Sequence, residues 1–339
     1  EIWADTADFN QVQYSMVADK INPSYSNRGS GQYFDVSTNL NIVLEDTIRN
    51  TNGDQIAIVW YWAEQMGDQY LIQAYIPSPD SITDYYYRFQ TKGTGKYDVW
   101  GDDPHLGLSD MVPSSQLPSI AVFPDISMYS PPDSLSTTVS SFQCSPNTIT
   151  VANYYNDSGY VNNLSNWVPG SGQRGMLAEN SSKGPTRTGL QKPDIAASGH
   201  YTLSTCPNGL LPFYHDSVIA YGGSHKLNGG TSMASPVVAG VAALYLEKCN
   251  LANNNDFKNT LLSNAYSDSW TGTLPDYGFG YGKVDGFATL INSSTDNQTS
   301  CNSYSWNGNT YTSSGIYTDS LTSISGCDSI VTLNLTIDS

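Results

Sequence analysis

The sequence of 339 residues predicts an α/β fold, with a parallel sheet and flanking helices in residues 119–292 and all-β units in 1–118 and 293–339. Three observations predict this. The first segment has short aromatic and β-branched runs between turn residues, without a convincing helical period. From Thr148 onward, strand-like runs alternate with helical ones, as in a parallel sheet flanked by helices. The polar stretch 292–299 reads as a linker and a domain boundary, after which strands and turns return.

The first segment is expected to be a β-sandwich. Its predicted strands are residues 40–45, 55–62, 69–76 and 85–90. Turn clusters such as Asn52-Gly53-Asp54 separate them, which is the pattern of a sandwich of short strands.

Two features of this segment also have functional interpretations. Trp60, Trp62 and the three tyrosines at 85–87 could form a platform on which sugars stack, but alternating strand aromatics more often divide between core and surface, which we favour. Asp102-Asp103 are candidate ligands for a structural calcium ion, but no loop has recognisable ligand spacing, and a solvated turn is favoured. No cofactor is expected to be required.

The middle segment contains the most informative stretch, Gly230-Thr231-Ser232-Met233-Ala234-Ser235-Pro236. It places Ser232 in a turn directly before residues 236–246, which are apolar on nearly every face and predict a buried helix. Unpaired N–H groups and the positive dipole end at a helix start favour a developing negative charge, which suits a nucleophilic serine. Alone, such a motif is more often an ordinary helix start capped by serine.

Three further segments strengthen the chemical interpretation, at residues 148–153, 181–199 and 280–285. Together with the serine motif, and in the same order, they resemble the subtilisin-like (S8) serine proteases: their "ITVGA" strand, their "SSRGPT…KPDIxAPG" segment and their closing "GxGxVN" turn. Ala197-Ser198 departs from the usual Ala-Pro of that family. The resemblance covers about half of the chain, from near Leu117 to near Asn292, and the serine motif is its most specific part.

This resemblance implies a subtilisin-like fold in which Ser232 is the nucleophile and Gly230 and Thr231 belong to the oxyanion turn. The family's Asp, His and oxyanion Asn precede the serine, yet neither Asp-(Ser/Thr)-Gly nor His-Gly-Thr occurs here. We therefore expect a fragment, with these three residues on an upstream piece of the same gene product. Some members carry a jelly-roll insert between the Asn and the serine. Residues 97–148 resemble the return from one, so 1–118 are expected to be that insert.

The four histidines, His105, His200, His215 and His225, lack the neighbourhood of a catalytic histidine. A triad is recognised by geometry and role, so the nearness of His225 to Ser232 in sequence is no argument for one. All four are expected to be surface or loop residues.

Composition favours an extracellular or cell-surface location. With 14 Lys+Arg against 31 Asp+Glu, the net charge of −17 argues against nucleic acid and anionic membranes as partners. Charged residues make up only 13%, whereas Tyr alone numbers 24, a profile of secreted β-rich proteins. No apolar run approaches the roughly 20 residues of a membrane span.

The C-terminal segment from Cys301 to Ile337 resembles a β-repeat near the C-termini of large bacterial surface proteins that use the type IX secretion route. Only one copy is present, so the chain is expected to be cut at this end too. A unit of fewer than roughly 40 residues needs a staple or neighbours, so Cys301 with Cys327 is the expected disulfide. Cys144, Cys206 and Cys249 leave an odd count; Cys206 with Cys249 is a further option that sequence cannot decide.

A recurring triplet reads Asp, hydroxyl, aliphatic, which resembles the O-glycosylation sequon of the same bacteria. Its hydroxyl residues are Thr6, Thr47, Ser81, Ser134, Ser217, Ser320 and Ser329. Several such triplets arise by chance in a sequence rich in Asp, Ser and Thr, so glycosylation stays open.

Two functional classes follow. The first is a secreted or surface-anchored endopeptidase that acts on a protein or peptide substrate through Ser232. The second is a catalytically inactive surface protein that kept the scaffold for structure or adhesion. The intact motif favours the enzyme, because a retired nucleophile is under no chemical demand to remain serine in a glycine turn.

Overall fold

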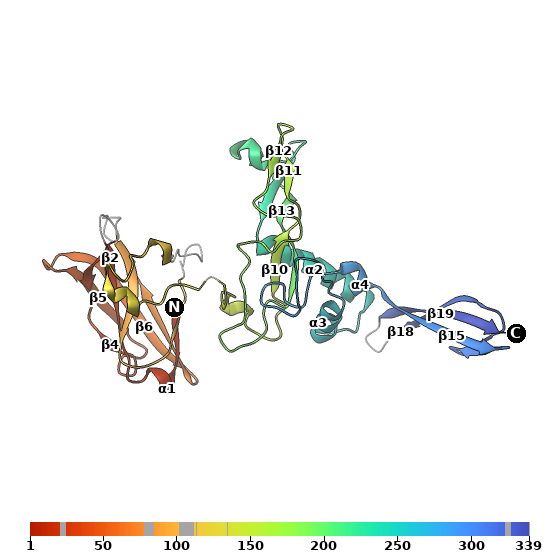
Figure 1. Ribbon diagram of the computed structural model, residues 1–339, viewed down its shortest axis with the longest axis horizontal. Helices are drawn as coiled ribbons and strands as arrows, with labels where there is room; N and C mark the ends of the chain where they lie inside the picture. Colours follow the sequence, from red (N-terminus) through yellow and green to blue (C-terminus); the bar gives the residue numbers. More distant parts are fainter. Residues whose placement is uncertain are drawn as a thin grey trace. The chain divides into compact units, whose positions relative to one another are not determined.

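A computed structural model of the chain describes residues 1–20, 25–77, 85–101, 112, 114–133, 135–322 and 327–338. The chain divides into two compact units, Glu1–Pro132 and Asp133–Ser339 (Figure 1).

The first unit is built on one nine-stranded sheet. Its elements are β1 (Ile2–Asp5), α1 (Thr6–Phe9), β2 (Gln13–Lys20), β3 (Ser26–Ser30), β4 (Phe34–Asp35), β5 (Val43–Asn50), β6 (Gln55–Met66), β7 (Gln69–Tyr75), β8 (Tyr85–Lys92) and β9 (Asp98–Val99). The strand order is β4-β2-β3-β5-β6-β7-β1-β9, with β8 paired to β2. Strands β5 to β8 overlap the four runs that the sequence predicts.

Strand β6 shows how the core of this unit forms. Ala57, Val59 and Tyr61 are buried, whereas Trp60 between them points to the outside, as the two-residue period of a strand requires. The Tyr61 hydroxyl accepts a hydrogen bond from the Met16 N–H at 2.8 Å, which joins β6 to β2. The aromatics thus divide between core and surface.

Tyr129, close to the end of this unit, packs against its strands. Asp19 is only 3% exposed and binds the Arg88 guanidinium Nε and the Tyr25 hydroxyl, each at 2.8 Å. The guanidinium of Arg88 lies 4.2 Å from the centre of the Tyr129 ring. These contacts explain why the division between the units falls after Pro132, downstream of the predicted boundary at residue 118.

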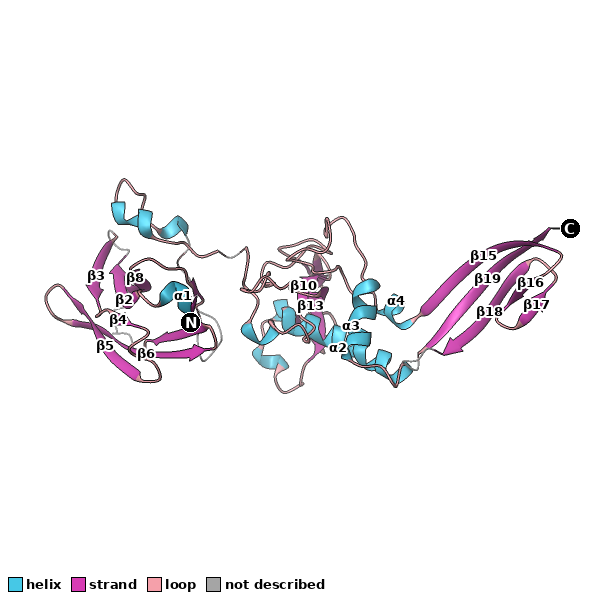
Figure 2. Cartoon of the chain, turned by 90° about the horizontal axis from the view of Figure 1, so that it is seen from below, coloured by secondary structure: helices cyan, strands magenta, loops and turns pink. Residues whose placement is uncertain are grey.

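The second unit holds a three-stranded sheet in the order β10 (Val151–Tyr155), β13 (Ile195–Thr205) and β14 (His225–Gly229). The remaining elements of residues 133–291 are the hairpin β11 (Gly159–Val161) and β12 (Trp167–Pro169) and the helices α2 (Thr231–Lys248), α3 (Asn254–Ser263) and α4 (Gly286–Leu290). Short 3-10 turns are η1 (Ser114–Gln116) and η2 (Pro124–Met128) in the first unit, and η3 (Ser141–Gln143), η4 (Leu211–Phe213) and η5 (Asp216–Val218) in the second. Figure 2 shows α2, α3 and α4 gathered beside β10 and β13.

The expectation of a largely parallel sheet is only partly correct. β10 and β13 are parallel, but β14 returns antiparallel to β13. The chain between them contains only the short turns η4 and η5, and a parallel return needs a long crossover. Among the described residues the chain is richer in strands than the predicted α/β class.

A buried ion cluster ties the start of β10 to β13. Lys192 is fully buried, and its Nζ lies 2.7 Å from Asp194 Oδ2 and 2.6 Å from the Thr148 carbonyl. The Thr150 N–H donates to Asp194 Oδ2, and Lys258 Nζ from α3 lies 2.7 Å from Asp194 Oδ1. A buried charge requires a hydrogen-bonded partner, so this cluster fixes the register of the two strands and the position of α3.

Helix α3 begins earlier than expected. The sequence predicts a helix over 256–265 capped by Asn254 or Asn255, but the cap is Asn253. Its side chain accepts from the N–H groups of Asn255 and Asp256, and the Asp256 carboxylate accepts from the Asn253 N–H at 2.9 Å. This reciprocal capping box satisfies more donors than the later caps could.

The polar stretch predicted as a linker is a strand, which corrects the expectation. β15 (Asn292–Cys301) pairs in parallel with β19 (Asp328–Asp338), and β18 (Gly315–Thr322) pairs antiparallel on the other side of β19. The hairpin β16 (Tyr304–Trp306) and β17 (Asn309–Tyr311) completes the unit. Leu333 and Leu335 of the central strand β19 are buried, and the polar strand β15 pairs with β19 along its whole length.

The predicted Cys301–Cys327 disulfide is wrong in this structure. Cys327 is bonded to Cys249, at the end of α2, with a sequence separation of 78 residues. Both bonded cysteines are buried, whereas Cys301 is exposed, and it, Cys144 and Cys206 are free. Sequence alone could not show that the start of β19 meets the end of α2. The disulfide therefore links the C-terminal β-repeat to the end of α2 and does not join two parts of the repeat.

Replacing both Cys249 and Cys327 by Ser should lower the free energy of unfolding of the second unit by roughly 2–4 kcal/mol, because a long loop is released in the unfolded chain. Urea unfolding measures the change, and non-reducing peptide mapping identifies the pair. Cys301→Ser is the control and should change stability by less than about 0.5 kcal/mol, since Cys301 is exposed and unbonded. A mapped Cys301–Cys327 peptide would contradict this assignment.

Candidate active site

Ser232 is the second residue of α2, and it is exposed. The helix begins at Thr231, five residues earlier than the predicted start at Pro236, so the serine lies in the first helical turn. Its N-cap is Gly230, whose backbone angles of φ 134° and ψ 168° are open to glycine and strained for other residues.

Two glycines bring this turn close to strand β13. The Gly230 N–H donates to the Gly199 carbonyl at 2.9 Å. A Cβ on Gly199 would stand only 2.7 Å from the Ala234 nitrogen, so the strand and the first turn of α2 meet backbone to backbone. The position of Ser232 is thus set by the sheet as well as by its own helix.

The start of α2 offers hydrogen-bond donors beside the serine. The N–H groups of Met233 and Ala234 both donate to the Gly230 carbonyl, at 2.9 and 3.4 Å. No acceptor for the N–H groups of Thr231 or Ser232 is found within the described ranges of the chain. Free N–H groups at a helix N-terminus favour an anion there, as a developing oxyanion requires.

Sequence reasoning missed two asparagines that line this turn. Asn153 of β10 is fully buried, and its Nδ2 donates to Asn180 Oδ1 at 3.3 Å. The Asn153 Oδ1 has no partner, and a Cβ on Gly199 would stand 2.6 Å from it. The Nδ2 of Asn180 would lie 4.0 Å from a Cβ on Gly230. A polar residue at the centre of a strand of apolar and aromatic residues was the available signal.

The expectation that all four histidines are surface or loop residues is wrong for His200. Its ring lies on β13 with ring centres 4.6 Å from Tyr155 and 4.8 Å from Tyr201, and its Nδ1 is buried without a partner. Burial lowers the pKa of His200, and the nearby Glu179 opposes this only in part. His200 therefore belongs to a packed aromatic cluster with Tyr155 and Tyr201. The sequence pattern did not reveal this cluster, because Tyr155 lies on another strand.

The other histidines do not complete a triad. His215 and His225 are exposed, on η5's N-cap and on β14, and His105 lies outside the described residues. In the part of the chain that the structure describes, no histidine is hydrogen-bonded to Ser232. Among the described residues, the site therefore consists of an exposed serine beside backbone N–H donors, with no histidine bonded to it.

Helix α2 is not buried all round, contrary to the prediction. Ala234, Val238 and Tyr245 are buried against the sheet and α3, while Leu244 and Leu246 are 52% and 46% exposed. The described elements cover only one side of the helix, so several of its apolar side chains are exposed there.

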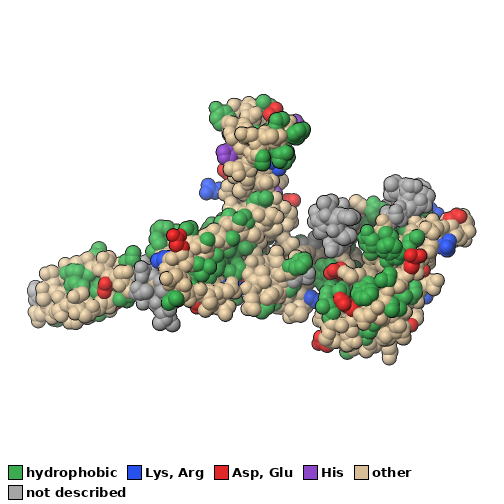
Figure 3. All heavy atoms as spheres, turned by 180° about the vertical axis from the view of Figure 1, so that it is seen from behind, with side chains coloured by type: hydrophobic (Ala, Val, Ile, Leu, Met, Phe, Trp, Pro, Cys, Tyr) green, Lys and Arg blue, Asp and Glu red, His purple; other side chains and the backbone are tan. Residues whose placement is uncertain are grey.

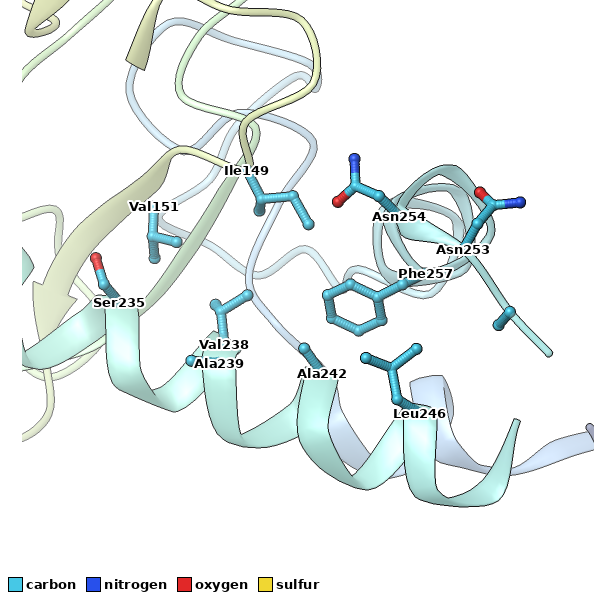
Figure 4. A pocket seen from close by; sticks show the side chains of 11 residues that line it. Ile149, Val151, Ser235, Val238, Ala239, Ala242, Leu246, Asn253, Asn254 and Phe257 are labelled. Atoms are coloured by element: carbon cyan, nitrogen blue, oxygen red, sulfur yellow. The ribbon is translucent and has the colours of Figure 1, made fainter. Parts of the chain in front are cut away.

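The uncovered side continues into an apolar groove of about 410 Å³ between α2, α3 and β10. Figure 4 shows Ile149, Val151, Val238, Leu246 and Phe257 around it, with Ser235 at one end. Its walls are mostly aliphatic, so it is suited to apolar side chains rather than to a charged ligand.

The remaining predicted site residues are scattered. Ser320 is exposed on β18, and Thr6, Thr47 and Ser217 are half-buried on α1, β5 and η5. Ser329 lies on β19, while Ser81, Ser134 and the Asp102-Asp103 pair lie outside the described residues. Glycosylation and a calcium site stay predictions.

The described residues offer neither a cluster of metal ligands nor a membrane-spanning helix. No three His, Cys, Asp or Glu side chains among them are grouped so that they could hold a metal ion. No helix among them is both long and apolar enough to cross a membrane.

Comparisons with known proteins bear on this site. The model of the subtilase family, peptidase S8, matches residues 127–282. The uncharacterized protein aq_aa18 of Aquifex aeolicus (strain VF5) is 40% identical over 95 residues, 28% of this chain and 42% of that protein. Serine protease AprX of Bacillus subtilis (strain 168) is 39% identical over 106 residues, 31% of this chain and 23% of that protein. The solved CspB protease of Clostridium perfringens aligns with a TM-score of 0.45 and 18% identity, over 85% of this chain and 54% of that one.

The family match contains Ser232 and extends to Gly282. Residues 127–282 are therefore similar to the subtilase family, the class that the resemblance implied. The chain spans less than half the length of these two curated relatives.

The lowered pKa of His200 makes stability depend on pH. The unfolded chain binds the proton more readily, so the stabilisation is full above the unfolded pKa of about 6.5 and is lost as the pH falls through the folded pKa. NMR titration should give His200 a pKa below that ordinary value. Between pH 5 and 7 the free energy of unfolding, measured in urea, should rise with pH. This rise should be smaller in His200→Gln. A His200 pKa above the ordinary value would contradict the packing described.

Proposed function

We propose that this chain is the nucleophile-bearing part of a subtilisin-like serine endopeptidase. The observation that carries the proposal is the exposed Ser232 in the first turn of α2, next to N–H groups that have no acceptor in the described chain. The subtilase match over residues 127–282 supports the same chemistry.

In this proposal, Ser232 Oγ attacks the carbonyl carbon of a peptide bond while a histidine takes the hydroxyl proton. The carbonyl oxygen becomes an oxyanion that accepts hydrogen bonds from the Ser232 N–H and from an asparagine side chain. Collapse breaks the C–N bond, and the histidine passes its proton to the leaving amine. Water then cleaves the acyl-serine ester by the same route.

The histidine, its aspartate and the asparagine are proposed to lie on an upstream part of the same gene product. Its docking surface is the groove beside α2 together with the exposed side of that helix, including Leu244 and Leu246. Covering an apolar side chain stabilises a protein by about 1.5–3 kcal/mol, so this surface favours a covering partner. The chain covers less than half the length of its curated relatives, which is consistent with a further part of the gene product as that partner.

We also propose an extracellular or cell-surface location. The support is the net charge of −17 and the Cys249–Cys327 disulfide, because disulfides persist in oxidising compartments.

A fluorophosphonate probe tests the proposed nucleophile. In the full-length gene product Ser232 should be labelled and Ser232→Ala should not, because the probe needs an activated serine. Ser263→Ala is the matched control: this serine is also exposed on a helix of the second unit but lies outside the groove, and its loss should leave labelling unchanged. The 339-residue chain alone should label at least about 10³-fold more slowly, since the base is absent.

The adduct is located by peptide mass spectrometry. A full-length protein that folds and yet leaves Ser232 unlabelled would reject the enzyme in favour of the inactive surface protein. Labelling at Ser235 instead of Ser232 would reject the assigned nucleophile.

A further inference from the structure

The outward face of strands β5, β6 and β7 in the first unit carries a row of aromatic residues. The register places Glu45 beside Trp60 and Trp60 beside Tyr75 in one row across the three strands. The next row places Trp62 beside Gln73. Trp60 and Trp62 are two residues apart on one strand, so their side chains share a face about 7 Å apart.

These aromatic rings are open to solvent. Trp60 and Tyr75 are 41% and 40% exposed, with ring centres 6.1 Å apart and planes inclined by 44°. The Trp60 Nε1 donates to Glu45 Oε2 at 3.0 Å, which fixes the orientation of the indole. The platform is therefore shaped before any ligand arrives.

Polar groups lie between and beside the rings. Glu45 is exposed, Glu64 is half-buried on the same face of β6, and Gln73 Nε2 donates to Glu1 Oε1 at 3.4 Å. Arg49, on the same face of β5, already donates to the Gly53 carbonyl at 3.1 Å. Figure 3 shows acidic side chains among hydrophobic ones on one face of the first unit.

The geometry points to a binding site for neutral glycans on this face, which we name the Trp60 platform and define as Trp60, Trp62, Tyr75, Glu45 and Gln73. The C–H groups on the apolar side of a sugar ring pack on the electron-rich face of an indole or phenol ring. Sugar hydroxyls donate to the carboxylate of Glu45 and bond the Gln73 amide. This inference does not depend on the proposed protease activity.

The chemistry of the platform argues against other occupants. An apolar protein surface would take water from the Glu45 carboxylate without adding a donor to the one from Trp60 Nε1, and burying a carboxylate so weakly compensated costs several kcal/mol. Anionic glycans and phosphate groups would meet like charge on Glu45 and Glu64. A neutral polyhydroxylated ligand satisfies the carboxylates and the rings together.

Affinity electrophoresis of the 339-residue chain tests the inference, in gels that contain hydroxyethylcellulose, laminarin, glycogen or alginate. We expect slower migration in at least one of the three neutral polysaccharides and none in anionic alginate. Trp60→Ala should weaken that binding at least tenfold, and Trp60→Phe should retain part of it. Tyr86→Ala is the matched control, because Tyr86 is equally exposed, at 42%, but lies on β8.

Far-UV circular dichroism and the unfolding midpoint establish that each variant is folded. If Trp60→Ala does not fold, Tyr75→Ala and Trp60→Phe decide the question. The inference is overturned if no neutral polysaccharide slows migration, if only alginate does, or if the Trp60 and Tyr86 variants behave alike.

Discussion

The close approach of strand β13 to the first turn of α2 is the constraint on which the site depends. The Gly230 N–H to Gly199 carbonyl hydrogen bond and the bare Cα of Gly199 let the two backbones meet. Because α2 is a rigid helix, fixing its first turn also fixes Ser232 and the direction of the eighteen-residue helix behind it. The buried cluster of Lys192 and Asp194 holds the starts of β13 and β10 in register. Ser232, the proposed nucleophile, therefore has a fixed place although no histidine is bonded to it among the described residues.

The same packing leaves one side of α2 uncovered. A helix that is apolar on nearly every face should be covered on every face, since exposed apolar surface favours burial. Here the sheet, α3 and α4 cover one side only, and Leu244 and Leu246 remain open. In the proposed enzyme, the polypeptide that supplies the catalytic base also supplies the missing cover. Folding of the site and completion of its chemistry would then be one event.

The sequence predicted the parts whose signals are local. Runs of aromatic and β-branched residues located β5 to β8, and the serine motif located the start of α2 within a few residues. It failed where distant residues decide the outcome. The partner of Cys327, the packing of His200 and the pairing of β15 with β19 all depend on contacts between segments far apart in the chain. The apolar composition of α2 was read correctly, but burial also requires a neighbour, which composition cannot show.

The central claim is most directly tested by the unfolding midpoint of Gly199→Ala measured beside Gly240→Ala. The added methyl at Gly199 would meet Asn153 Oδ1, Ala234 N and Ala234 Cβ at 2.6 to 2.8 Å, whereas the one at Gly240 meets no atom within 4 Å. The account predicts that Gly199→Ala is less stable by roughly 1–3 kcal/mol, and that Gly240→Ala is unchanged or more stable by up to about 1 kcal/mol. A Gly199→Ala variant as stable as the parent chain would contradict it.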